Sequence, residues 1–162
     1  MEYTGPRLSD SLIGAMRALI LLTKDTSLEW GFTFTPSSKS VKVLRGTSDL
    51  VNLPTVLSGY SFHTHPPEEW ELTEMFSPSD IQTASNEMGS FLGFSKGKTL
   101  MIKYLSGRAF RPEDTRKIIA KDEQLIAQIK ETRETADMYR QRRLEFFKRL
   151  DTKAAIVSVM RV

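Results

Sequence analysis

The sequence predicts a single α/β domain that continues into a helical C-terminal part. Three observations favour this class. Segments whose apolar residues recur at helical spacing alternate with short segments rich in aromatic and β-branched residues. The length of 162 residues suits one compact domain. Hydrophobic residues make up 40% and charged residues 27% of the chain, as in ordinary folded domains and unlike disordered ones.

The first predicted element is an amphipathic helix over residues 8–22. Its leucines and Met16 recur at helical spacing, and Ser9 or Asp10 can cap its first turn. The polar residues 23–27 are expected to end it.

Three extended segments follow this helix. Residues 28–34 (LEWGFTF) alternate phenylalanine with threonine, which predicts a strand. A turn over 36–40 leads to a second predicted strand over 41–44. A third extended segment, 57–65 (LSGYSFHTH), is closed by two prolines.

A second helix is predicted to begin at Ser77-Pro78-Ser79-Asp80 and to run to about Met88. Serine at the N-cap, proline in the first turn and an acid three residues after the serine are typical of a helix start. Two more strands are predicted over 91–94 and 99–105.

The C-terminal third differs in charge and pattern. Residues 1–106 hold 9 Lys+Arg and 11 Asp+Glu, net −2, whereas residues 107–162 hold 14 and 9, net +5. After Pro112 no Gly or Pro occurs up to Asp151, which predicts one long helix or a helical hairpin, followed by a closing strand over 155–160. We therefore divide the chain into a domain over 1–106 and a basic helical extension over 107–162.

Composition excludes several kinds of site. The chain has no cysteine, so it has no disulfide framework, cysteine zinc finger, iron–sulfur site or cysteine nucleophile. Its longest apolar stretch is too short to cross a bilayer, and the N-terminus lacks the pattern of a signal peptide. We expect a cytoplasmic protein without a membrane partner.

The two histidines of the chain are His63 and His65. Residues i and i+2 of a strand point to the same face, so the two imidazoles would lie side by side as a ready pair of zinc ligands. A catalytic zinc needs a third protein ligand and an open position. Asp80, in the first turn of the next predicted helix, is the candidate.

His63-Thr64-His65-Pro66 followed by Ser77-Pro78-Ser79-Asp80 resembles the JAMM motif of the MPN (JAB-domain) metalloproteases. In that family a glutamate at the start of the first strand precedes H-[ST]-H-P and S-x-x-D, and Glu29 stands at this place. The resemblance covers roughly residues 8–106. It implies an MPN-like, cytidine-deaminase-like fold, in which helices flank a mixed β-sheet.

The resemblance also implies roles for these residues. His63, His65 and Asp80 would hold Zn²⁺, which acidifies water and polarises the scissile carbonyl. Glu29 would be the general base, and Ser77 would donate a hydrogen bond to the developing oxyanion. The implied activity is that of a deubiquitinase-like isopeptidase. Its substrate would be a protein or peptide tail, with ubiquitin-like proteins among the candidates.

The chain departs from the family pattern between His65 and Ser77. Residues 66–76 form a longer connection than is usual, and it contains Trp70 and four glutamates. We weigh two interpretations. The connection is a lid that contacts substrate through Trp70, or it changes the reach of Asp80 and impairs the site.

Plainer interpretations stand beside the zinc site. The histidines would be an exposed pair on a strand, Ser77 and Asp80 a simple capping box, and Glu29 a solvated residue at a strand start. Four other acidic residues could replace Glu29 or Asp80: Glu68, Glu69, Glu71 and Glu74.

The extension supports two further hypotheses. Residues 138–149 (MYRQRRLEFFKR) interleave basic and aromatic side chains, which could bind nucleic acid. We favour an amphipathic helix that packs on the domain, on a second copy or on a partner protein, and do not expect a nucleic-acid partner. The alternative to an enzyme is an inactive MPN-like scaffold that assembles with partners through this helix.

Overall fold

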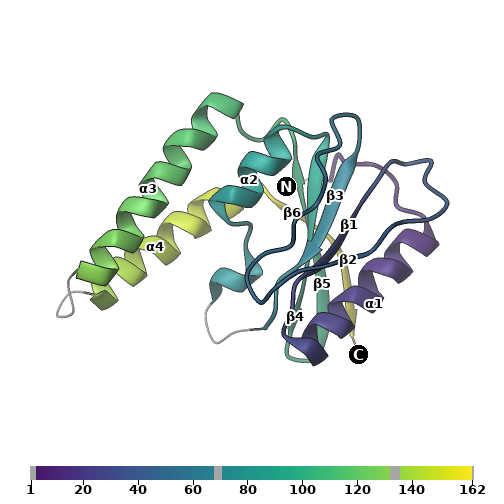
Figure 1. Ribbon diagram of the computed structural model, residues 1–162, viewed down its shortest axis with the longest axis horizontal. Coiled ribbons are helices and arrows are strands. Elements are labelled where there is room, and N and C mark those ends of the chain that lie inside the picture. Colours follow the sequence, from purple (N-terminus) through teal and green to yellow (C-terminus); the bar gives the residue numbers. More distant parts are fainter. Residues whose placement is uncertain (1–2, 68–70, 132–135, 162) are drawn as a thin grey trace.

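The computed structural model describes residues 3–67, 71–131 and 136–161, and within them six strands form one open mixed sheet (Figure 1). The strands are β1 (Trp30–Phe34), β2 (Leu44–Arg45), β3 (Tyr60–Thr64), β4 (Gly89–Lys96), β5 (Thr99–Ser106) and β6 (Ala155–Arg161). The helices are α1 (Asp10–Thr26), α2 (Pro78–Ser85), α3 (Pro112–Glu131) and α4 (Ala136–Asp151), with a 3₁₀ helix, η1 (Glu71–Glu74). The predicted α/β class is confirmed.

The strand order is β2-β1-β3-β4-β5-β6. β3 and β4 are parallel, and every other neighbouring pair is antiparallel. The parallel pair needs a crossover connection, which η1 and α2 supply. The connection that carries Asp80 therefore starts at the end of β3, where the histidines lie.

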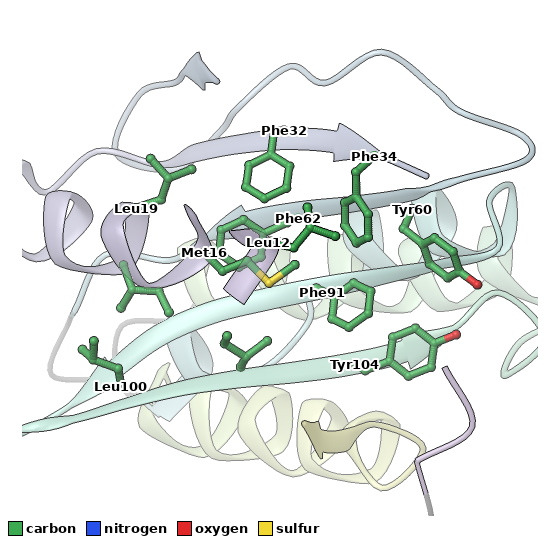
Figure 2. Packing of buried hydrophobic residues seen from close by; sticks show 12 residues of the cluster. Leu12, Met16, Leu19, Phe32, Phe34, Tyr60, Phe62, Phe91, Leu100 and Tyr104 are labelled. Atoms are coloured by element: carbon green, nitrogen blue, oxygen red, sulfur yellow. The ribbon is translucent and has the colours of Figure 1, made fainter. Parts of the chain in front are cut away.

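Helix α1 covers one face of the sheet, whereas α2 and the α3–α4 hairpin lie on the other (Figure 1). Leu12 and Met16 of α1 pack on the aromatic side chains of β1, β3, β4 and β5 (Figure 2). Burial of such side chains is the main stabilising contribution to a fold of this kind. The cluster is: Leu12, Met16, Leu19, Ile20, Phe32, Phe34, Tyr60, Phe62, Phe91, Leu100, Ile102 and Tyr104.

The opposite face carries a second core. Ile81 and Ala84 of α2 pack against Leu92 and Phe94 of β4. Phe91, one residue before Leu92, points instead into the α1 core. Both faces of β4 are therefore covered, and successive residues along this strand pack alternately into the α1 core and the second core.

The C-terminal extension forms a hairpin, one of the two arrangements that the sequence left open. The guanidinium of Arg143 in α4 bridges both carboxylate oxygens of Asp122 in α3, at 2.7 and 3.2 Å. Phe146 and Phe147 are buried against Met75, in the connection before α2, so α4 packs on the domain itself. β6 then pairs with β5. The division at residue 106 stays a prediction.

Several predicted boundaries were wrong. The first helix runs to Thr26, past its expected end at residue 22, and the strand expected over 91–94 spans Gly89–Lys96. The strand expected over 41–44 is limited to Leu44–Arg45, because these are the residues that pair with β1. The helix expected to reach Met88 ends at Ser85, since Met88 donates its backbone N–H to the Gly59 carbonyl at 3.0 Å and the chain enters β4. In the described part of the chain, no helix has the length and apolar character that a membrane span requires.

Candidate metal centre

The two histidines lie on the face of the sheet that α2 covers. His63 is in β3, and its neighbours Phe62 and Thr64 point to the α1 side, where Thr64 makes a hydrogen bond with Thr23 of α1. The backbone N–H of His65 donates to the carbonyl of Gly93 at 3.0 Å, which extends the pairing with β4 past the end of β3. The pleat therefore directs both imidazoles to the same side.

Asp80 is held at the start of α2 by a capping box. Its backbone N–H donates to the Ser77 hydroxyl at 3.1 Å, and its Oδ2 accepts the Ser77 backbone N–H at 2.8 Å. Two orphan N–H groups of the helix are satisfied in this way. The predicted cap is confirmed, and the Oδ1 atom remains available on the side of His63.

His63, His65 and Asp80 converge so that their ligand atoms lie within 4.8 Å of one another, and together they could hold a metal ion. The two Nε2 atoms are 3.1 Å apart. Nε2 of His63 lies 3.3 Å from Oδ1 of Asp80, and Nε2 of His65 lies 3.4 Å from Oδ2. Two ligands of a tetrahedral zinc, each about 2.0–2.1 Å from the ion, lie about 3.3 Å apart. Two nitrogens and one carboxylate are also a donor set that zinc accepts.

The ring of His65 is oriented by a backbone carbonyl. Its Nδ1 atom lies 3.0 Å from the Thr73 carbonyl oxygen, which can only accept, so Nδ1 carries the proton. In the neutral imidazole Nε2 is then unprotonated, and it faces the other ligand atoms. A hydrogen bond of this kind, which sets the tautomer, is usual for metal-binding histidines.

Glu29 is buried beside the histidines, with 6% of its surface exposed and Oε1 4.0 Å from Nε2 of His65. Its backbone is held by Thr47 and Gly46, each through a hydrogen bond of 2.7 Å. Burial raises the pKa of Glu29 to about 7, although His65 opposes this rise. In the chain without a metal, a carboxyl group with such a pKa can both accept and return a proton near neutral pH.

The electrostatics of Asp80 are the reverse of those of Glu29. Burial alone would raise the pKa of Asp80, but His63 and His65 lower it well below 3.8. Asp80 is therefore an anion at neutral pH, as a metal ligand must be.

These residues line a cleft of about 300 Å³. Ser77 lines it with Asp80, and so do residues 49–53, which lie between β2 and β3 in the sequence. The cleft is open to solvent, so small solutes can reach the ligand set. Trp70, Glu68 and Glu69 lie outside the described residues. Glu71 pairs with Lys148 at 2.9 Å and Glu74 with Lys96 at 3.3 Å, and neither belongs to the candidate metal group.

Sequence reasoning missed three features of the site. The Thr73 carbonyl is a backbone group, so no residue type announces it. The wall over 49–53 comes from a segment with no motif. Ser61 lines the cleft two residues before His63, and the i,i+2 rule that paired the histidines could have found it.

No protein-family model, curated protein or solved structure matches this chain. The side chains of the cleft are therefore the basis on which a function can be proposed.

Proposed function

We propose that this protein is a zinc-dependent metallopeptidase of the JAMM type, which hydrolyses an amide or isopeptide bond in a protein or peptide tail. The observation that carries the proposal is the convergence of His63, His65 and Asp80 beside the buried Glu29, in one open cleft. A mixed sheet with helices on both faces is compatible with an MPN-like fold.

The residues divide the chemistry between them. His63, His65 and Asp80 would hold Zn²⁺, which when bound supplies a Lewis acid that acidifies water and polarises a carbonyl. Glu29 takes a proton from the attacking water and passes it to the leaving nitrogen. One water is consumed, and the amide yields a carboxylate and a protonated amine, which takes both protons of the water. The Ser77 hydroxyl accepts a hydrogen bond from Asp80, and its own proton is free to be donated to the substrate oxygen.

The size of the cleft favours a tail as substrate. A space of about 300 Å³ admits an extended chain end and no folded domain. Leu50, Val51 and Leu53 give part of the lining an apolar character. A flexible tail, such as that of a ubiquitin-like protein joined to lysine, satisfies both conditions.

The first test is the metal content of the purified protein, measured by elemental analysis. We expect about one zinc per chain in the wild type and none in His65→Ala or Asp80→Asn. Asp49→Asn is the matched control, because Asp49 lines the same cleft and loses the same charge without being a ligand. A wild type that takes up no zinc from a zinc-containing buffer would overturn the proposal and leave the inactive scaffold.

The second test is hydrolysis of ubiquitin-like conjugates by the zinc-loaded protein. Glu29→Gln should keep its zinc and lose the general base, a step worth roughly 10²–10⁴-fold in rate. Retained zinc with unchanged hydrolysis in Glu29→Gln would remove Glu29 from the mechanism.

A further inference from the structure

The connection between His65 and Asp80 lies between the candidate metal centre and the C-terminal hairpin. It includes η1, which contacts α4, a helix more than sixty residues later in the sequence. In Figure 1 the α3–α4 hairpin lies on the α2 side of the sheet, away from α1. The longer connection, which is the chain's main departure from the JAMM pattern, is therefore the part that the hairpin touches.

An apolar cluster joins the two segments. Met75, 4% exposed, packs with Phe146 and Phe147 of α4, which are 6% and 3% exposed. Leu72 packs against the same cluster from within η1. The ion pair between Glu71 and Lys148 lies at the rim, where both side chains are about half exposed, so it contributes little. Leu72 and Met75, on either side of Thr73, are thus packed in one cluster with the aromatic side chains of α4.

The same short segment orients a metal ligand. Thr73 lies between Leu72 and Met75, and its carbonyl accepts the proton on Nδ1 of His65 at 3.0 Å. The Met75 N–H donates to the Leu72 carbonyl at 3.2 Å, which closes a turn around Thr73. The backbone of His65 is held by Gly93 of the sheet, so the Thr73 carbonyl acts on the tautomer and the direction of its ring.

We propose that the α3–α4 hairpin is a positioning element of the metal centre, and that it acts through Phe147 and Met75 on the Thr73 carbonyl and so on His65. The inference rests on the proposed function, because that function supplies the metal. The orientation of the His65 ring does not require a bound metal. Phe147 and Met75 are positioning residues, because neither belongs to the candidate metal group. Loss of a partner that orients a ligand typically lowers metal affinity 10–100-fold.

The test uses the full chain labelled with ¹⁵N-histidine, in which only His63 and His65 give signals. In the metal-free wild type we expect His65 to be mainly the Nδ1–H tautomer in long-range ¹H–¹⁵N spectra. Phe147→Ala and, separately, Met75→Ala should shift this population toward Nε2–H. Zn²⁺ affinity, measured by competition with a chromophoric chelator, should fall 10–100-fold in both variants.

The matched control is Leu12→Ala in α1. Leu12 is 5% exposed in the core on the opposite face of the sheet, so its truncation destabilises the fold without touching residues 72–75. We expect its His65 tautomer and Zn²⁺ affinity to stay within twofold of wild type. Phe147→Leu, which keeps an apolar side chain in the cluster, should restore most of the affinity lost in Phe147→Ala. If Phe147→Ala does not fold, Met75→Ala alone tests the proposal.

The outcomes separate the two proposals. Unchanged tautomer and affinity in the Phe147 and Met75 variants, with zinc bound by the wild type, would overturn the hairpin's role alone. An equal loss in Leu12→Ala would also overturn it, because the effect would then be one of general stability. If the wild type binds no zinc but the Phe147 and Met75 variants still shift the His65 tautomer, the hairpin's role is supported while the metallopeptidase proposal fails.

Discussion

Removing the ionisable group of Glu29 should change how the stability of the metal-free protein depends on pH. Burial raises the pKa of Glu29 from 4.5 to about 7, so the folded chain holds this proton more tightly than the unfolded chain does. The stability that this group contributes is fully present below pH 4.5 and is lost as the pH rises through 7. Glutamine has a similar shape and cannot ionise, so Glu29→Gln should not show this loss.

The size of the effect follows from the pKa. A rise from 4.5 to about 7 corresponds to about 3 kcal/mol of unfolding free energy. Glu29→Gln should therefore match the wild type at pH 4.5 and exceed it by up to about 3 kcal/mol above pH 7. Because domains of this size are stable by about 5–15 kcal/mol, the difference would be readily measured.

The assay is urea unfolding at several pH values between 4.5 and 8.5, in the presence of a chelator. The chelator is needed because a bound cation would itself lower the pKa of Glu29. Glu123→Gln is the control, since Glu123 is exposed on α3. Its substitution should leave the pH dependence of stability unchanged from that of the wild type. A difference between Glu29→Gln and wild type that stays constant from pH 4.5 to 8.5 would show that Glu29 is not held as this structure places it.

Four further changes test other parts of the structure. Burial opposes ionisation of Asp80, but its two histidine neighbours lower its pKa well below 3.8. The carboxylate therefore stabilises the fold above pH 3.8, and this contribution is lost as the pH falls through the lowered pKa. Asp80→Asn should flatten that acid limb in a circular-dichroism titration of metal-free protein. Burial also raises the pKa of Glu87, so Glu87→Gln should gain stability over wild type at pH 8 and not at pH 4.5, as measured by urea unfolding. Phe32→Ala empties the centre of the α1 core and should cost about 3–5 kcal/mol in the same assay, whereas Val43→Ala, at a 42% exposed position, should cost well under 1 kcal/mol. Gly97 lies in the turn between β4 and β5 with φ +61°, and a Cβ added there would meet no atom. Gly97→Ala should still lower the free energy of unfolding by about 1 kcal/mol, as measured by thermal unfolding, because an L side chain disfavours this backbone conformation.

The elements that depend on near neighbours in the chain were predictable. Ser77-Pro78-Ser79-Asp80 forms the expected cap because the serine hydroxyl and the aspartate carboxylate satisfy N–H groups only three residues away. The hairpin of β4 and β5 around Gly97 is equally local. The short β2 was mispredicted because its extent depends on its pairing with β1, whose residues lie thirteen and fifteen positions away, and not on its own residues.

The three candidate metal ligands could be predicted from the sequence, whereas the rest of the site and its geometry could be predicted only in part. An i,i+2 histidine pair on a strand must share a face, so the sequence alone makes His63 and His65 neighbours. The approach of Glu29 depends on the register of β1 against β3, in which Gly31 pairs with His63. No local pattern specifies that register, since it follows from how the phenylalanines of both strands fill the α1 core.

What the sequence by itself determined is the α/β class, the capped start of α2 and the residue types of the candidate ligand set. Each of these depends on backbone stereochemistry and on contacts between residues a few positions apart. Only the tertiary structure decided that Glu29 is buried with a pKa of about 7, that the Thr73 carbonyl orients His65, and that Phe147 packs on the connection before α2. Burial and long-range packing join segments that are distant in the chain, and their free energies exist only when all those segments are in place.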